Sequence, residues 1–307
     1  MRKLTLIILS LLIVLCGCGK TEETVSTAVF TDALGREVAL TSNKRVISAY
    51  GSFAEVWTLA GGTLVGVTED AISERQLELG DDVAIIGSVK APDLEFIISL
   101  EPDFLILSAD IAPHVSLDEA LTNAGITHAY FRTDTFEQYL EMLNLFCSLT
   151  GREDLYKANG TDIKDKIDTI ISAVQSGEKR PSVLLIRAFS TGAKAKGADN
   201  PAGVILEDLN TDNIVERHNS LLEDLSIEEI IAEDPDYIFV STMGSDDKAL
   251  AALAEGIASN PAWKDLSAVK NGRYNILPKE LFHYKPNAKW AESYEYIAKI
   301  IYPEITA

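Results

Sequence analysis

The chain has 307 residues, of which 47% are hydrophobic, and this is enough apolar material for two cores of ordinary domain size. It carries 47 acidic residues against 27 lysines and arginines, for a net charge of −20. Nucleic acid is a poor partner for so acidic a surface, and we expect none.

The first 17 residues, MRKLTLIILSLLIVLCG, have the pattern of an export signal, with a basic pair ahead of an apolar run. The run is too short for a membrane span, which needs about 20 apolar residues. Its end resembles the bacterial lipobox, in which a small residue precedes a lipidated cysteine. We predict lipidation at Cys18, with Cys16 as the weaker alternative, and a lipidated tether over 18–29. The protein is then extracytoplasmic and anchored to the bacterial cell membrane by lipid.

Residues 30–150 are predicted to form an N-terminal α/β lobe. RVISAY (45–50) is a strand pattern, and SFAEVWTLAG (52–61) is a helix that Ser52 can cap and Gly61 can end. Strand and helix patterns alternate over the rest of the lobe. This alternation favours a mostly parallel sheet covered on both faces.

Residues 151–178 are predicted to form one inter-lobe helix. The residues that fall on a single helical face are Ile163, Ile167, Ile170, Ile171 and Val174. The helical pattern itself runs from about Glu153 to Val174, and a helix of roughly 22 residues is about 33 Å long, enough to run alongside both lobes and to limit hinging. Gly160 is its weak point, where we expect a kink or a break into two helices.

Residues 179–307 are predicted to form a C-terminal α/β lobe on the same plan, with VLLIRA (183–188), YIFV (237–240) and RYNIL (273–277) as strands. The chain closes with a helix whose apolar face carries Trp290, Tyr294, Ile297 and Ile301. The expected fold class is α/β, with two Rossmann-like lobes, mostly parallel sheets, one long inter-lobe helix and a ligand cleft between the lobes.

One short pattern occurs twice. DLEFIISLEPDFLIL (93–107) and SIEEIIAEDPDYIFV (226–240) align without a gap, each with paired isoleucines, a Pro-Asp break and a β-type run. A single recurrence at such a distance indicates two similar lobes within one chain. The alternative is chance recurrence of a common α/β pattern.

These two stretches, together with LTGRE before the long helix, NPAWKDLSAVKNGRYNILP and the ending KPNAKWAESYEYIAKIIYPE, resemble a known family. It comprises the lipid-anchored substrate-binding proteins of ABC importers that have a rigid inter-lobe helix and serve iron-siderophore, haem and cobalamin uptake. The resemblance implies a monomer that captures a small-molecule metal chelate and delivers it to a permease dimer with its ATPase subunits. The bound ligand would be a ferric siderophore, haem or a corrinoid, and no cofactor is implied.

The resemblance also implies that Glu95 and Glu228 dock on the two permease subunits. A pseudo-symmetric permease presents two like sites, which agrees with one such charge on each lobe. Glu229 replaces Glu228 if the register slips by one. The other interpretation is that both glutamates only favour the first turn of a helix.

In open parallel sheets, ligands bind beyond the carboxyl ends of the strands. This rule selects as candidate ligand-binding residues Tyr50, Ser52, Lys90, Phe131, Arg132, Arg187, Phe189, Met243, His283 and Tyr284. Tyr50 and Phe189 each end the first predicted strand of their lobe, so their rings can contact a flat or apolar ligand from two sides. The alternative is that both rings lie in the core.

Charge narrows the expected ligand. Arg187 closes a strand and, with Lys194 and Lys196, forms a basic patch in an otherwise acidic chain. Such a patch favours an anionic ligand such as a ferric complex or haem. For the two lysines, a solvated loop is the favoured interpretation. Direct ligation of iron by His283 or Tyr284 is a further possibility. We expect no metal site of the protein's own.

An enzyme and a metal-ion-binding protein are the other classes of function to compare with the sequence. The sequence has no G-x-S-x-G, P-loop, G-x-G-x-x-G or H-E-x-x-H motif, and Cys147 lies in an apolar helical pattern typical of a buried thiol, so we predict no enzyme. A zinc- or manganese-binding importer lipoprotein is the alternative, but the four histidines are scattered through the sequence. A surface-anchored enzyme that uses the cleft is less favoured.

Overall fold

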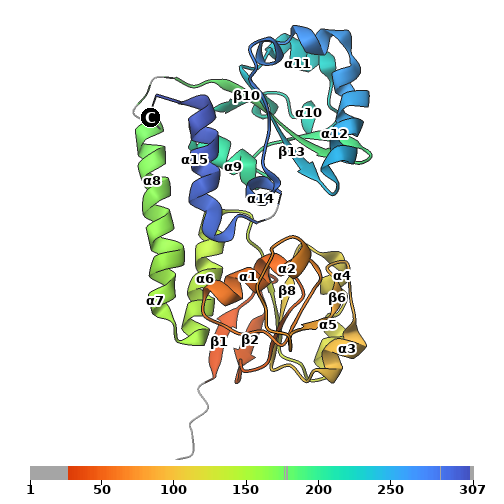
Figure 1. Ribbon diagram of the computed structural model, residues 1–307, viewed down its shortest axis with the longest axis vertical. Coiled ribbons are helices and arrows are strands. Elements are labelled where there is room, and N and C mark those ends of the chain that lie inside the picture. The colour runs from red at the N-terminus through yellow and green to blue at the C-terminus, as the bar shows by residue number, and fades with distance from the viewer. Residues whose placement is uncertain (1–26, 176, 178, 284, 305–307) are drawn as a thin grey trace, which may run out of the picture.

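The computed structural model describes residues 27–175, 177, 179–283 and 285–304. The signal segment 1–17, Cys18 and Tyr284 lie outside the described residues, as does most of the proposed tether. Two α/β lobes follow one another along the long axis of the molecule (Figure 1), each built on its own five-stranded sheet. The predicted fold class is therefore confirmed.

The sheet of the N-terminal lobe is parallel throughout, with the strand order β5-β4-β3-β8-β9. Its strands are β3 (Val46–Ser48), β4 (Gly66–Val67), β5 (Ala84–Ile85), β8 (Phe104–Ser108) and β9 (His128–Phe131). Every residue of β3, β8 and β9 is buried, as expected for strands covered on both faces. Two antiparallel hairpins flank the sheet: β1 (Ala28–Thr31) with β2 (Glu37–Leu40), and β6 (Gly87–Ser88) with β7 (Ala91–Pro92).

The helices of this lobe are α1 (Gly51–Leu59), α2 (Asp70–Ser73), α3 (Leu94–Ser99), α4 (Ala112–Val115) and α5 (Asp118–Asn123). The start of α1 corrects one expectation: the helix begins at Gly51 after Tyr50, which has an extended backbone, and no side chain caps it. Ser52 lies inside the first turn. Gly61 lies two residues after the last residue of the helix and has a φ of 81°. This left-handed conformation agrees with the prediction that Gly61 ends the helix.

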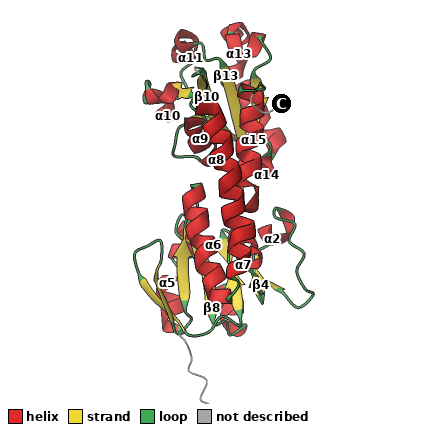
Figure 2. Ribbon diagram, turned by 90° about the vertical axis from the view of Figure 1, so that its left-hand side faces the viewer, coloured by secondary structure: helices red, strands yellow, loops and turns green. Residues whose placement is uncertain are grey.

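A long helical path leads from one lobe to the other. After α6 (Phe136–Thr150) the chain continues through α7 (Glu153–Tyr156), the π-helical turn η1 (Lys157–Thr161) and α8 (Asp162–Gln175). Figures 1 and 2 both show this path running beside the two lobes, with α6 and α15 (Trp290–Ile301) along it. Ile163, Ile167 and Val174 are buried, and Ile170 and Ile171 are partly buried on the same apolar cluster.

Gly160 lies in the π-helical turn, so the helical path widens at this residue but does not break. A Cβ atom at Gly160 would stand 3.1 Å from Leu140 and 3.3 Å from Leu143, both on α6. The glycine therefore allows α6 to pack closely against the turn.

The C-terminal sheet has the order β11-β10-β13-β14, with β12 beside β10, and only β11 is antiparallel to its neighbour. Its strands are β10 (Ser182–Phe189), β11 (Gly192–Lys196), β12 (Asp212–Asn213), β13 (Tyr237–Met243) and β14 (Tyr274–Ile276). The helices around it are α9 (Pro201–Asp208), α10 (Ser220–Glu223), α11 (Ile227–Glu233), α12 (Asp246–Glu255), α13 (Ser267–Lys270) and α14 (Lys279–Phe282). Short 3₁₀ turns lie at Ile214–Glu216 (η2), Ile257–Ser259 (η3), Pro261–Asp265 (η4) and Asn287–Lys289 (η5).

One apolar cluster continues from lobe to lobe. It joins residues of the N-terminal lobe, the long helical path, the C-terminal sheet and α15. The rings of Phe136 at the start of α6 and Trp290 at the start of α15 have centroids 5.9 Å apart. Because protein interiors are close-packed and resist deformation, this shared packing opposes large hinge motion.

The repeated pattern has the same structure in both lobes. Asp93 and Ser226 cap α3 and α11 by accepting a hydrogen bond from the backbone N–H three residues later. β8 and β13, which follow, lie in the interior of their sheets. Asp103 accepts the backbone N–H of Arg45 just before β3, and Asp236 accepts that of Ser182 at the start of β10. The Pro-Asp pair thus ends a helix and ties two neighbouring strands together at their first residues.

Candidate functional site

The two lobes face each other near the carboxyl ends of β3 and β10. Tyr50 follows β3, and its ring packs edge-on against Phe53 with the centroids 4.9 Å apart. Burial raises the pKa of the Tyr50 phenol above its usual value of 10, so the phenol is neutral at physiological pH. It is a partly buried aromatic side chain with one polar tip.

Arg187 lies on β10, two residues before the strand ends, and is half-buried. Burial lowers the pKa of its guanidinium, while Tyr50 and Asp199 raise it, so Tyr50 of the opposite lobe lies within electrostatic range. An arginine stays protonated under physiological conditions. Among the described residues, no carboxylate lies within the 4.0 Å that defines an ion pair with Arg187. A half-buried positive charge is thus available to a ligand.

His283 follows α14 and is half-buried near Arg187. Burial, together with the positive charges of Arg187 and Lys279, lowers the pKa of its imidazole to about 4 against the opposing effect of Asp246. The imidazole is therefore neutral at physiological pH. Tyr50, Arg187 and His283 together are called the interlobe site below.

Carboxylates of the N-terminal lobe border this site. Glu69, Asp70 and Glu74, with Lys90, are among the residues that line a hollow of about 250 Å³. Partial burial and the neighbouring Asp70 raise the pKa of Glu74, and Lys279 of the opposite lobe lowers it. Groups of opposite charge thus face each other across the lobes.

The segment between α14 and α15 crosses to the N-terminal lobe and is bound there. Asn287, fully buried, donates its amide N–H to the carbonyl of Ser52 at 2.8 Å and to the carboxylate of Glu55 at 2.6 Å. Its backbone has a φ of 53°, a conformation that asparagine tolerates better than most residues.

Two further contacts bind the crossing segment. Arg75 on the N-terminal lobe donates to the carbonyl of Lys285 at 2.9 Å and forms an ion pair with Glu55. The ammonium of Lys285 lies 2.5 Å from the carboxylate of Asp134. His283, which the structure places just before this segment, is therefore carried on a chain that contacts both lobes.

The structure brings together some of the predicted ligand-binding residues. Tyr50, Arg187 and His283 form the interlobe site, and Lys90 lies on the rim of the neighbouring hollow. Phe189 and Met243 are paired at the ends of β10 and β13, with Met243 42% exposed. Their side chains add apolar surface to the C-terminal lobe at the ends of these two strands.

Other predicted residues lie apart from this site. Phe131 is 7% exposed and packs against the rings of Phe53 and Phe146, and Ser52 is 1% exposed within α1. Both are interior residues in this structure, because the end of a strand or the start of a helix also has an inward face. Arg132 is exposed and pairs with Asp110 at 2.6 Å.

Sequence reasoning missed Glu74 and Lys279. Neither follows directly on a strand: Glu74 comes just after α2, and Lys279 opens α14. Their neighbourhood depends on how the two lobes are set against each other, which no local pattern encodes.

The proposed docking residues are exposed on the first turns of their helices, Glu95 on α3 and Glu228 on α11. These helices lie toward opposite ends of the molecule (Figure 1). The alternative, Glu229, accepts hydrogen bonds from the hydroxyl of Ser220 at 2.8 and 3.0 Å, so its carboxylate is engaged within the lobe.

The described part of the chain has neither a cluster of side chains suited to a metal ion nor a helix suited to a membrane. No cluster of three or more His, Cys, Asp or Glu side chains there is arranged to hold a metal ion. None of the helices in that part combines the length and apolar character needed to cross a membrane.

The match to a family model covers residues 46–281, which is more than half of the chain, and its description is periplasmic binding protein. The chain belongs to the periplasmic binding protein family. Its members are extracytoplasmic substrate-binding proteins, and the predicted resemblance is confirmed.

Individual relatives agree with this family. The Fe(3+)-citrate-binding protein YfmC of Bacillus subtilis (strain 168) is 26% identical over 261 residues, covering 84% of this chain and 80% of that protein. The structure of Staphylococcus aureus SirA complexed with staphyloferrin B has a TM-score of 0.69 at 21% identity and covers 90% of this chain and 98% of that one. S. aureus IsdE complexed with heme has a TM-score of 0.70 at 15% identity, with coverages of 85% and 100%. At these identities the two structures establish a shared fold.

Proposed function

We propose that this protein is the extracytoplasmic binding component of an ABC importer that captures an anionic iron complex, a ferric siderophore or haem, between its lobes. The observation that carries the proposal is the half-buried guanidinium of Arg187, which forms no ion pair with a carboxylate of the described residues and which lies within electrostatic range of Tyr50 of the other lobe. A charge removed from water is costly unless a counter-charge accompanies it. An anionic ligand supplies that counter-charge.

The names of similar proteins support an iron complex as the ligand. One curated relative binds ferric citrate, and two structural neighbours were solved with staphyloferrin B and with haem. Citrate-type siderophores and haem carry carboxylates, which a guanidinium recognises through paired hydrogen bonds. The apolar surface of Met243 and the ring of Tyr50 suit the uncharged parts of such ligands.

His283 adds a second kind of contact. Its lowered pKa keeps the imidazole neutral, and the lone pair of a neutral imidazole can ligate haem iron. In this proposal the iron complex is cargo that the protein releases, and the protein has no resident cofactor.

Delivery needs a permease, and we propose that Glu95 and Glu228 are the residues that dock on its two subunits, which work with their ATPase subunits. Both carboxylates are exposed and occupy equivalent positions of the repeat. Glu228 is the better candidate on α11, because it is exposed, whereas Glu229 is half-buried and both of its carboxylate oxygens accept hydrogen bonds from Ser220. We further propose that the protein acts as a monomer held at the membrane by lipid on Cys18.

Titration of purified protein with ferric citrate, ferric staphyloferrin B, haem and cobalamin tests the proposal. Tryptophan fluorescence reports binding, and a new visible absorption band identifies haem or a corrinoid. We expect saturable binding of an iron complex. Tight binding of cobalamin alone would correct the ligand class, and catalytic turnover of any compound without retention of it would overturn the proposal.

A further inference from the structure

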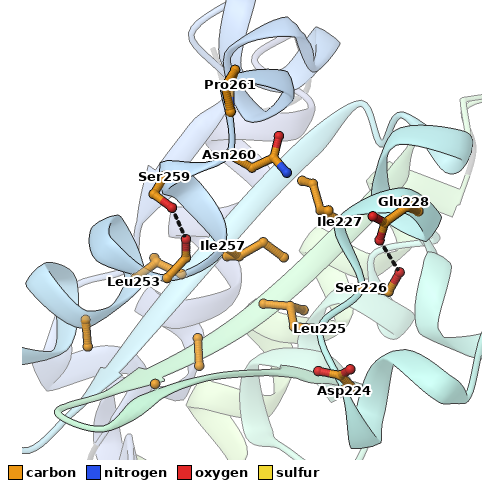
Figure 3. Close-up of a pocket in the computed structure, with 14 residues that line it drawn as sticks. Asp224, Leu225, Ser226, Ile227, Glu228, Leu253, Ile257, Ser259, Asn260 and Pro261 are labelled. Atoms are coloured by element: carbon orange, nitrogen blue, oxygen red, sulfur yellow. Dashed lines mark hydrogen bonds between the residues drawn. The ribbon is translucent and has the colours of Figure 1, made fainter.

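A hollow of about 670 Å³ opens on the C-terminal lobe beside Glu228 (Figure 3). Its lining comes from the start of β11, the residues that lead into α11, the end of α12, η3 and the start of η4. It is separate from the interlobe site, since none of Tyr50, Arg187 and His283 lines it. Cavities of this size take up small molecules or protein side chains.

The hollow has a mixed lining, in which polar surface exceeds apolar surface and four aliphatic side chains form an apolar part. Leu253 is 1% exposed and lies at its base, while Leu225, Ile227 and Ile257 are half-buried and contribute to its walls. Figure 3 shows the side chains of Leu225, Ile227 and Ile257 gathered around the same space. Apolar surface left partly open in this way favours an apolar occupant.

The charge around the hollow has one sign. Its two ionisable lining residues are Asp224 and Glu228, both exposed, and none of the fourteen residues that line it is basic. The hydroxyl of Ser226 lies 3.2 Å from the carboxylate of Glu228 and holds it at the edge. An occupant that carries a positive charge next to an apolar group matches this lining.

The corresponding site on the N-terminal lobe also presents apolar side chains. Beside Glu95, Phe96 and Ile98 are 39% and 41% exposed, so apolar side chains protrude there. In the repeat, Phe96 aligns with Glu229, which is hydrogen-bonded to Ser220. Ile231, which aligns with Ile98, is 42% exposed on α11, so both candidate docking residues lie next to exposed apolar side chains and Glu228 lies beside the hollow as well.

We propose that this hollow is a second contact of the C-terminal lobe with the permease, and that it receives an apolar side chain carried next to the basic residue that pairs with Glu228. The inference rests on the proposed function, because it takes the permease as the occupant. Glu228 belongs both to the docking surface and to the rim of the hollow, so the two contacts are continuous. Buried apolar anchors with a charged rim are how protein interfaces concentrate their binding energy.

Filling the hollow tests this assignment. Ala252 lines it from α12 and is half-buried, whereas its neighbour Ala251 is exposed and does not line it. We expect Ala252→Trp to lower cellular uptake of radioactive iron at least about tenfold, and Ala251→Trp to leave it unchanged within about twofold. The iron is supplied as ferric citrate, ferric staphyloferrin B or haem, whichever the wild type takes up. Affinity for that complex should be the same in all three proteins.

A second measurement needs neither the ligand nor a folded tryptophan variant. A benzophenone amino acid at position 252 in living cells should cross-link to a membrane subunit of the importer, near an apolar residue adjacent to lysine or arginine. The same probe at position 251 should not. Absence of a cross-link from 252, or wild-type uptake by Ala252→Trp, would overturn the inference, as would recovery of a small molecule bound in the hollow.

The outcomes also separate this inference from the proposed function. If Glu95→Ala and Glu228→Ala abolish uptake while Ala252→Trp does not, docking stands and the hollow is not part of it. If the wild type binds none of the iron complexes, the proposed function fails, and the cross-link alone decides whether the hollow contacts a membrane protein.

Discussion

At the scale of single residues, Arg187 is the clearest functional signal. It lies two residues before the end of the mostly buried strand β10. Burial lowers the pKa of its guanidinium, so the folded protein pays for holding a charge there. Such a cost without a compensating ion pair in the described residues is expected at a binding site.

Arg187→Ala should weaken binding of the iron complex about 10- to 100-fold, because a hydrogen bond to a charged group contributes about 1.5–3 kcal/mol. The free energy of unfolding without ligand should stay the same or rise, since an unneutralised buried charge is removed. Ligand titration and urea unfolding measure the two effects.

Lys194→Ala is the matched control for Arg187. The two residues are cross-strand partners on β10 and β11, but Lys194 is exposed. Its removal should change neither affinity nor stability appreciably. Equal losses of affinity in both variants would show that net charge, and not the position of Arg187, determines binding.

His283 predicts a pH dependence of folding. Its pKa is lowered to about 4 in the folded protein from an ordinary 6.5, so the unfolded chain takes up this proton more readily. The stability linked to His283 is therefore fully present above about pH 6.5 and is lost as the pH falls toward 4. At pH 5 the loss amounts to roughly 2 kcal/mol.

His283→Gln stays uncharged and should lack this component. Urea unfolding of wild type and variant at pH 7 and pH 5 measures this component. The difference in stability between the two proteins should change from pH 7 to pH 5, because all their other residues are the same. Arg187 and Lys279 are the other charges that face the imidazole. A wild-type to variant difference that is equal at both pH values would contradict a lowered pKa.

At the scale of elements, the repeated pattern shows what sequence can predict. Asp93 and Ser226 are good helix caps, and the apolar runs after each Pro-Asp pair are too short for helices, so helix, break and strand follow from local chemistry. The structure adds the reason for the aspartate. Asp103 and Asp236 each bind the first residues of a neighbouring strand, a non-local role that the pattern alone does not reveal.

Some residues of the candidate site follow from local sequence patterns, and others depend on how the lobes pack. Strand ends located Tyr50 and Arg187, because the carboxyl ends of parallel strands meet at one edge of a sheet. The rule cannot tell the inward from the outward face, so it also selected Phe131, whose ring joins the aromatic core. Glu74 and Lys279 were missed because their proximity arises from lobe packing, and the buried turn at Asn287 has no local signal beyond one asparagine.

A substitution at Gly160 measures how much the close packing of α6 contributes to the free energy of unfolding. Gly160→Leu would place a side chain where even a Cβ lies 3.1–3.3 Å from Leu140, Leu143 and Tyr156. We expect the free energy of unfolding to fall by about 1–3 kcal/mol. Ala158→Leu adds a leucine to the same helical turn on its exposed side and should change stability by less than about 0.5 kcal/mol. Urea unfolding of both variants is the measurement, and equal stabilities would show that α6 moves aside without cost.

At the scale of the whole molecule, three connections hold the lobes in one arrangement. The helical path of α7 and α8, the packing of Phe136 on Trp290, and the crossing segment bound through Asn287 all span the two lobes. Their combined packing favours small adjustments over wide closure on ligand binding. Under the proposed function, a molecule that changes shape little is recognised by features present in one fixed geometry, and we propose the exposed glutamates on α3 and α11 as those features.

This geometry makes docking separable from ligand binding. The helices α3 and α11, which carry Glu95 and Glu228, lie toward opposite ends of the molecule (Figure 1), and neither glutamate is part of the interlobe site. Each single change to alanine should lower uptake of the iron complex about tenfold or more, and the double change should abolish it, because each removes one charge pair at an interface. Affinity of the purified protein for the iron complex should not change. Glu229→Ala is the matched control on the same helical turn: its carboxylate is engaged with Ser220, so uptake should stay near that of the wild type. If Glu229→Ala and Glu228→Ala exchange these outcomes, Glu229 is the docking residue, and if the double variant transports normally, the two lobes are recognised through other surfaces.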